Sequence, residues 1–196
     1  MALRDVRASV IAIVVATLVL GLGFPALATG FAQLAFSHKA DGSLVKVDGK
    51  IVGSSLVGQG FTKPQYFHPR PSATTPPYNG AATTFANFGP TNPDLSKDVA
   101  SRAQAILKLE GPYNPGLTIH DIPVDAVTTS GSGVDPDITP AYARLQAKRI
   151  AAVRKLPLST INKLIDDNTD GRSLGFFGEP GVNVLELNLA LDKQGS

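Results

Sequence analysis

The stretch VIAIVVATLVLGL, residues 10–22, decides the architecture of the N-terminal part of this chain. It lies inside a longer run, residues 8–37, that holds no Asp, Glu, Lys or Arg. About 20 residues of α-helix cross the roughly 30 Å hydrocarbon core of a bilayer, and this run is longer than that. We therefore expect a single transmembrane helix over residues 8–36.

The charged residues that flank this run predict its orientation. Arg4 and Arg7 precede it, with Asp5 between them. The first ionisable residues after it are His38, Lys39 and Asp41. Because Lys and Arg gather on the cytoplasmic side of membrane helices, we expect residues 1–7 in the cytoplasm and residues 37–196 as a soluble domain outside it.

A cleaved secretory signal is the alternative interpretation of the same run. Ala26-Leu27-Ala28 has the pattern of a cleavage site and follows an apolar stretch with basic residues in front of it. That stretch is at or beyond the usual length of a signal peptide's apolar core, and the sequence after Ala28, TGFAQLAF, stays apolar. A retained anchor fits these features better. Pro25 is expected to kink or end the anchor helix.

The composition excludes several classes of site. The chain has no Cys and only three His, which excludes thiolate zinc sites, iron–sulfur clusters, disulfides and cysteine nucleophiles. Its 18 Lys and Arg residues nearly balance its 16 Asp and Glu residues, and no Lys/Arg stripe indicates a nucleic-acid surface. Charged residues make up 17 % of the chain, below the usual value of about 25 %, which agrees with a membrane segment.

The soluble part is predicted to have an α/β (α+β-like) fold with a hairpin, two to three helices and a C-terminal strand. Residues 43–55 alternate apolar and polar side chains on both sides of Asp48-Gly49, the pair that a type I′ hairpin turn favours. The run VNVLELNLAL, residues 182–191, is predicted to be a central strand. Helical spacing of apolar residues predicts helices over residues 93–109, from near Pro136 or Thr139 to about Lys155, and over residues 159–167.

The turn TTSGSGVDP, residues 128–136, precedes the second predicted helix. Backbone N–H groups of a Ser/Gly turn ahead of a helix can hold an anion, and neither Gly131 nor Gly133 has a side chain to block its approach. No Walker A motif occurs in the chain, so an ordinary turn is the alternative. Gln146 lies in the helix beside cationic residues and could hydrogen-bond a nucleotide or a partner. Those cationic residues are Arg144, Lys148, Arg149 and Arg154.

An anchored hydrolase is a further class of function, and the sequence supports it least. Residues 67–72, FHPRPS, bring an imidazole, a guanidinium and a hydroxyl close together along the chain. Hydrolysis by a Ser/His pair needs a base held against the nucleophile and an oxyanion site. The chain has no G-x-S-x-G motif that would supply this arrangement.

Five blocks of the sequence together resemble the C subunit of the Kdp-type potassium-transporting ATPase, a small membrane component of a bacterial potassium pump. The blocks are FPALATGFAQLAF leading into ADGSLV (24–45), GSSLVGQGFTKPQYFHPRPSA (53–73), YNGAATTFANFGPTNPDL (78–95), VTTSGSGVDPDITPAYARLQAKRIAAVR (127–154) and LGFFGEPGVNVLELNLALD (174–192). They follow in order over nearly the whole chain. The sequence departs from the family pattern at Phe24, where Tyr is commoner, and at residues 87–93, where Ser-Asn-Leu-Gly-Pro is usual.

The resemblance implies a non-catalytic accessory subunit of the bacterial inner membrane, with one transmembrane helix and an α/β domain. It implies assembly with a channel-like potassium-binding subunit and a P-type ATPase subunit, and no cofactor, metal site or catalytic residue in this chain. Residues 58–92 form a long loop rich in Pro and aromatic residues, and its part from residue 61 is expected to supply much of the docking surface. The candidate docking residues are Phe61, Tyr66, Phe67 and Arg70.

The resemblance also implies a role in ATP binding, because the family is described as a catalytic chaperone that raises the ATP affinity of the ATPase subunit. The matching positions are Ser130, Gly131, Ser132, Gly133 and Gln146. The charge bias places this domain outside the cytoplasm, where ATP is scarce, so ATP is expected to act through the complex. The alternative is a nucleotide-binding regulatory module with a cytoplasmic domain.

Overall fold

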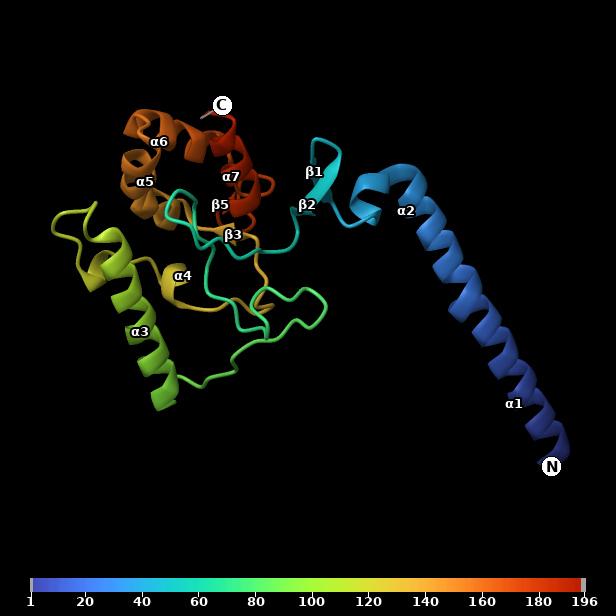
Figure 1. Ribbon diagram of the computed structural model, residues 1–196. Coiled ribbons are helices and arrows are strands. Elements are labelled where there is room, and N and C mark those ends of the chain that lie inside the picture. The colour runs from blue at the N-terminus through green and yellow to red at the C-terminus, as the bar shows by residue number, and fades with distance from the viewer. Residues whose placement is uncertain (1, 195–196) are drawn as a thin grey trace. The chain divides into compact units, whose positions relative to one another are not determined.

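The computed structural model describes residues 2–194 and divides into two compact units, the first ending at Val52 and the second beginning at Gly53. The first unit starts with one long helical stretch (Figure 1). It consists of α1 (Ala2–Ala16), the π-helical segment η1 (Thr17–Gly23) and α2 (Phe24–Ala40). The part from Leu3 to Ala40 is long and apolar enough to cross a membrane, with a mean hydropathy of 2.6 in its most apolar window.

Of the two outcomes expected at Pro25, a kink or an end, the end of the anchor helix is wrong, because the helix continues to Ala40. Pro25 lies in the first turn of α2, directly after the wider π-helical turns of η1. A proline lacks the N–H that an interior helical residue donates, and a π-helical segment before it accommodates that loss without ending the helix. The non-helical backbone lies instead at Phe36, with φ −143° and ψ 41°.

The predicted hairpin is confirmed. It consists of β1 (Leu44–Val47) and β2 (Lys50–Ser54), which pair with each other. Asp48 and Gly49 form the turn with φ values of 49° and 76°. Both values are positive, as a type I′ turn requires.

The three predicted helices of the second unit are also confirmed. They are α3 (Pro93–Glu110), α5 (Pro140–Arg154) and α6 (Leu158–Asp167). The side chain of Asn92 caps α3 by accepting from the N–H of Asp94, and Thr139 caps α5 by accepting from the N–H of Tyr142. Two short helices, η2 (Ile119–Asp121) and α4 (Val124–Val127), lie between α3 and α5 in the sequence.

The C-terminal strand is shorter than predicted. Only β5 (Gly181–Asn183) is extended, and it is the central strand of a small antiparallel sheet with β3 (Asp137–Ile138) and β4 (Thr169–Asp170) on either side. The prediction of a strand over the rest of residues 182–191 is wrong, because the chain continues as α7 (Val184–Asp192). The buried residues of α7 follow helical spacing, and they are Val184, Leu185, Leu187, Asn188 and Leu191.

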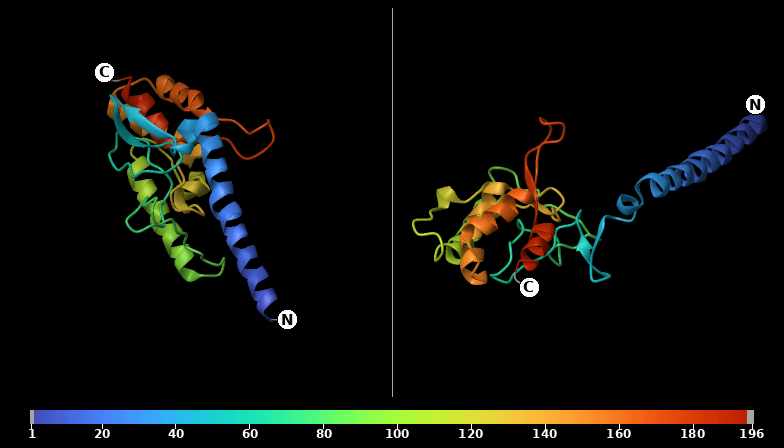
Figure 2. Two further views of the ribbon diagram at one scale, coloured as in Figure 1. Left: turned by 90° about the vertical axis from the view of Figure 1, so that its right-hand side faces the viewer. Right: turned by 90° about the horizontal axis from the view of Figure 1, so that it is seen from above.

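The core of the second unit lies between its longer helices and the small sheet. The helices α5 and α6 pack against each other, and α6 packs against α7 (Figures 1 and 2). Phe67, from the long irregular segment before α3, is completely buried in this core. The fully buried members contributed by helices and strands include Ala143, Ile150, Ile161, Ile165, Val182, Leu187 and Leu191.

Candidate functional site

The long loop is fastened to the helices by two buried amide side chains. Asn188 of α7 accepts from the N–H of Phe67 at 2.8 Å and donates to its carbonyl oxygen at 3.0 Å. Gln146 of α5 does the same for His68, at 2.8 Å and 3.0 Å. Each amide thus satisfies both backbone groups of one residue, as a neighbouring strand would. Two helices therefore fix the path of the loop at successive residues.

Arg149 adds a charged contact to the same segment. Its guanidinium donates to the carbonyl oxygens of Pro64 and Tyr66 and to Oε1 of Gln146, and it pairs with the carboxylate of Glu110 at 2.8 Å. Both members of the ion pair are buried. The sequence-based view of Arg149 as part of a cationic face beside Arg144 is therefore wrong. Arg144 is exposed, whereas Arg149 holds the loop from inside.

The candidate docking residues near the start of the loop lie mostly against the rest of the second unit. Phe67 has an exposed fraction of 0 %. The hydroxyl of Tyr66 donates to Asp192, and the guanidinium of Arg154 lies 4.9 Å from the centre of its ring. Phe61 packs against Tyr66 with the ring centres 5.6 Å apart. In the loop, the aromatic side chains with large exposed surfaces are found further on, at Phe85 and Phe88.

Arg70 connects the docking loop to the Ser/Gly turn. Its Nη1 pairs with Asp135 at 2.9 Å, and its other nitrogens donate to the carbonyl oxygens of Thr128 and Thr129. The carbonyl of Arg70 in turn accepts from the hydroxyl of Tyr78 at 3.0 Å. Burial raises the pKa of Tyr78 to about 12, so this phenol stays protonated and able to donate.

The Ser/Gly turn is held by its own hydroxyl groups. The N–H of Gly133 donates to Oγ of Ser130 at 2.9 Å, and the N–H of Val134 donates to Oγ of Ser132 at 3.2 Å. The carbonyl of Gly133 accepts from Ser72 of the loop at 2.6 Å. These bonds occupy two of the backbone N–H groups that an anion bound in this turn would contact.

The N-terminus of α5 is separate from this turn, because β3 lies between them. A carboxylate of the chain itself binds Thr139, the residue that caps α5. Asp125 accepts from the N–H of Thr139 at 2.7 Å and from its hydroxyl at 3.0 Å. The favourable position for negative charge at this helix end is therefore filled by Asp125.

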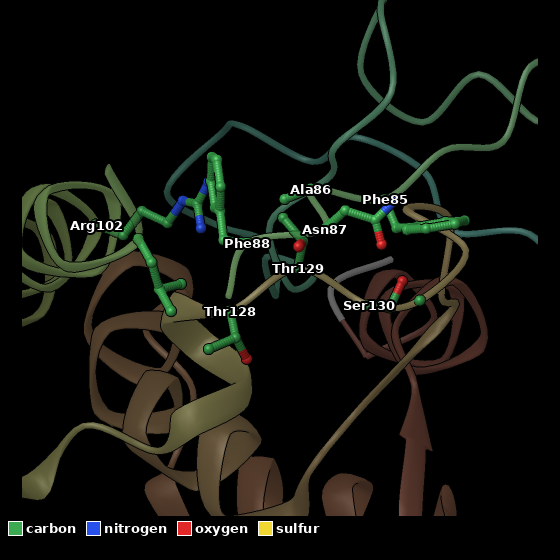
Figure 3. A pocket seen from close by; sticks show the side chains of 10 residues that line it. Phe85, Ala86, Asn87, Phe88, Arg102, Thr128, Thr129 and Ser130 are labelled. Carbon is green, nitrogen blue, oxygen red and sulfur yellow. The ribbon is translucent and has the colours of Figure 1, made fainter. Parts of the chain in front are cut away.

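A pocket of about 240 Å³ lies beside the turn (Figure 3). Its walls come from the loop, from α3 and from the Ser/Gly turn. Arg102 and the phenyl ring of Phe88 lie close together at one end in the view of Figure 3, and Phe85 lies at the other end near Ser130. The lining residues are Phe85, Ala86, Asn87, Phe88, Leu95, Arg102, Thr128, Thr129, Ser130 and Gly131.

The five candidate nucleotide residues are not all brought to this pocket. Ser130 and Gly131 line it, whereas Gln146 is completely buried with its amide bonded to His68 and Arg149. A nucleotide contact by Gln146 would have to replace bonds that position the loop. Arg102 also lines a second pocket of about 220 Å³, which includes Phe61, His68, Tyr78 and Tyr142.

The sequence did not indicate most of the residues that hold the docking loop in place. Glu110 ends α3 and looks like a solvated charge, and Asn188 falls inside the run that was predicted as a strand. Their partners are far away in the sequence, so no local pattern indicates them. Among residues 2–194 no group of three or more His, Asp or Glu side chains forms a metal-binding cluster.

Comparison with known proteins shows the family. A family model described as "K+-transporting ATPase, c chain" matches residues 6–193. The chain belongs to the KdpC family. The match spans both units, and it confirms the resemblance that the five sequence blocks indicate.

KdpC subunits of several bacteria are similar over nearly their whole length. The potassium-transporting ATPase KdpC subunit of Beijerinckia indica subsp. indica is 46 % identical over 190 residues, which cover 97 % of this chain and 94 % of the relative. That of Methylococcus capsulatus is 48 % identical over 187 residues, covering 95 % and 96 %. That of Caulobacter vibrioides is 48 % identical over 191 residues, covering 97 % and 93 %. As a KdpC chain, the protein is a subunit of a potassium-transporting ATPase and has partner subunits.

Proposed function

We propose that this KdpC chain is a non-catalytic accessory subunit that promotes assembly and stability of the potassium pump. In this proposal the N-terminal helix crosses the inner membrane once, with Arg4 and Arg7 in the cytoplasm and the second unit outside. The partners are a channel-like potassium-binding subunit and a P-type ATPase subunit. The flanking charges and the apolar helix from Leu3 to Ala40 support this topology.

The proposal rests on the hydrogen bonds that buried polar side chains make to the backbone around the loop. Gln146, Arg149 and Asn188 are buried and bonded to loop backbone, and Arg70 is bonded to the Ser/Gly turn. They hold the surface of the loop in place. This part of the loop is preorganised for a protein partner, because it has little conformational entropy left to lose on binding.

Assembly of the complete pump tests the docking loop. The variants Arg70→Glu and Tyr66→Ala remove contacts that position the loop, and Phe85→Ser with Phe88→Ser removes exposed aromatic surface without touching the core. We expect less of the complex to survive purification in mild detergent with each of them. The matched control is Arg144→Glu, because the ion pair of Arg144 with Asp166 is exposed. An intact complex with all of the loop variants would reject the docking role.

The topology can be tested by labelling introduced cysteines, because the chain has no cysteine of its own that would react. Single cysteines at Leu3 and at the exposed Gln104 report the two sides of the membrane. We expect a membrane-impermeant thiol reagent added to intact cells to label the Gln104→Cys chain and not the Leu3→Cys chain. The reverse pattern would place the second unit in the cytoplasm.

A nucleotide-binding regulatory role is the second candidate, and one observation favours it. Ser130 and Gly131 line a pocket together with two Phe side chains and Arg102, which combines hydroxyl, aromatic and cationic groups. If this pocket contacts ATP, Arg102→Gln and Ser130→Ala should raise the KM of the pump for ATP while the complex stays intact. An unchanged KM in intact complexes with both variants, together with labelling of Gln104→Cys from outside, would reject this role.

A further inference from the structure

The loop between β4 and β5 carries an exposed apolar tip. In both views of Figure 2 this loop, coloured orange to red, projects from the body of the second unit. Leu174, Phe176 and Phe177 have exposed fractions of 83 %, 64 % and 58 %. We call these three side chains the apolar tip. Soluble surfaces seldom present several large apolar side chains side by side unless something covers them.

The apolar tip is held in one shape by hydrogen bonds. Ser173 and Phe177 exchange both backbone N–H···O bonds, each at 2.9 Å. The rings of Phe176 and Phe177 lie with their centres 4.1 Å apart. At the base, Arg172 and Glu179 form an ion pair at 2.7 Å that closes the loop. The tip is therefore a preorganised knob on a short hairpin.

The backbone at the tip is strained at Leu174. Leu174 has a φ of 54°, a left-handed conformation that is unfavourable for a residue with a large side chain. The neighbouring Gly175 has a φ of 83°, which suits glycine. A polar residue such as Asn would be easier to accommodate at position 174 if the loop only had to turn. The chain instead places one of its most exposed apolar side chains there.

We propose that the apolar tip docks into an uncharged, apolar pocket on another protein subunit of the potassium-transporting ATPase. The inference rests on the family membership, which makes this chain a subunit, and on a surface distinct from the docking loop at residues 61–92. The tip from Ser173 to Gly178 carries no charge, so a charged pocket would gain no partner for its charge.

A protein pocket fits the observations better than a lipid surface. A fluid bilayer accepts apolar groups of any shape, whereas a protein pocket requires a particular shape and binds best a group whose conformation is already set. Phe is enriched at protein interfaces, while Trp and Tyr are the residues that gather at the membrane interface, and the tip has neither. The other subunits of the pump are the protein partners to which the apolar tip would bind.

Binding of the complete chain to the pump lacking this subunit tests the proposal. We expect Phe176→Ser with Phe177→Ser to weaken binding by at least about tenfold, as loss of two interface anchors does. The side chains are exposed, so the thermal midpoint of the second unit should not change. Val124→Ser is the matched control, because Val124 is 73 % exposed but lies elsewhere. Equal binding by the tip variant and the wild type would overturn the proposal.

A fluorescent label separates the protein pocket from the bilayer. The chain with Leu174→Cys as its single cysteine is labelled with an environment-sensitive dye and placed in nanodiscs of phosphatidylethanolamine and phosphatidylglycerol. We expect the emission to shift to shorter wavelength only after the other pump subunits are present, and the same label at Gln104→Cys to show no shift. A shift in nanodiscs without those subunits would assign the tip to the lipid and overturn the proposal.

The test of the apolar tip can be told apart from the test of the docking loop. If the Arg70 and Phe85 variants assemble normally while the tip variant does not, the loop hypothesis falls and the tip remains. If the wild-type chain does not assemble with the pump at all, both fall.

Discussion

The guanidinium of Arg149 and the carboxylate of Glu110 meet at 2.8 Å in the interior of the second unit. Arg149 shares its remaining donors among the carbonyl oxygens of Pro64 and Tyr66 and the amide of Gln146. Glu110 Oε2 has no hydrogen-bond partner among the described residues. Burial raises the pKa of Glu110, and the neighbouring Arg149 opposes this effect. One charge pair therefore connects α3, α5 and the docking loop.

Removing one charge of this pair should destabilise the second unit strongly. We expect Glu110→Gln to lower the free energy of unfolding by about 3 kcal/mol, because it leaves the buried guanidinium of Arg149 without its counter-charge. Denaturant titration of the complete chain in mild detergent can follow this by tyrosine fluorescence. All four tyrosines lie in the second unit and the chain has no tryptophan, so the signal excludes the membrane helix.

The exposed pair of Arg144 and Asp166 provides the control, because it has the same chemistry in contact with solvent. Asp166→Asn should change the free energy of unfolding by less than about 1 kcal/mol. If Glu110→Gln were as mild as Asp166→Asn, the buried pair would not hold the loop.

Local signals predict the helices of this fold well and its buried polar contacts poorly. The start of α3 can be located from Asn92 followed by Pro93, because a cap and a first-turn proline are short-range features. No such short-range feature distinguishes the buried Arg149 from the exposed Arg144. The partner of Arg149, Glu110, lies 39 residues earlier, and only the packing of α5 against α3 brings them together.

The hydrogen bonds that Asn188 and Gln146 make to the loop should act on separate residues of the loop. Asn188→Ala leaves the N–H and carbonyl of Phe67 buried without partners, so we expect a loss of about 3 kcal/mol in the free energy of unfolding. Hydrogen exchange gives the sharper measurement. The amide of Phe67 should lose protection first in Asn188→Ala, and the amide of His68 first in Gln146→Ala. Equal loss at both amides in both variants would mean that the loop detaches as one piece.

The run that contains Asn188 shows why the C-terminal part was mispredicted. Leu and Val at residues 182–191 alternate closely enough to suggest a strand. The same residues also fit a helix, because short apolar runs satisfy both periods. Asn183 decides between them, since its side chain accepts from the N–H of Glu186 and caps α7. That bond also explains why the extended segment ends after three residues.

The glycines of the Ser/Gly turn offer a matched pair of substitutions. Gly133 has a φ of 72°, and a Cβ atom there would meet the carbonyl oxygen of Thr84. Gly131 is exposed and has no atom within 4 Å of the position of a Cβ. We expect Gly133→Ala to cost about 2 kcal/mol in the free energy of unfolding and Gly131→Ala less than about 0.5 kcal/mol. The same denaturant titration measures both, and similar values would contradict a requirement for glycine at position 133.

His68 makes the stability of the second unit depend on pH. Its Nε2 lies 3.1 Å from the carbonyl oxygen of Lys63, and its backbone is held by Gln146. Burial lowers the pKa of His68 below the usual 6.5, the bond to Lys63 opposes this, and Arg149 adds to the lowering. The folded protein therefore keeps this imidazole neutral at a pH where the unfolded chain already binds a proton.

The sign of the pH effect follows from that difference. As pH falls through 6.5 toward the lowered pKa of folded His68, the unfolded state takes up the proton and the folded state does not, so stability is lost. We expect the wild type to lose more free energy of unfolding between pH 7.5 and pH 5.5 than His68→Gln, by at most about 1.4 kcal/mol per pH unit. Denaturant titrations of both complete chains across this range measure the difference. Parallel pH profiles would show that His68 titrates normally in the folded protein.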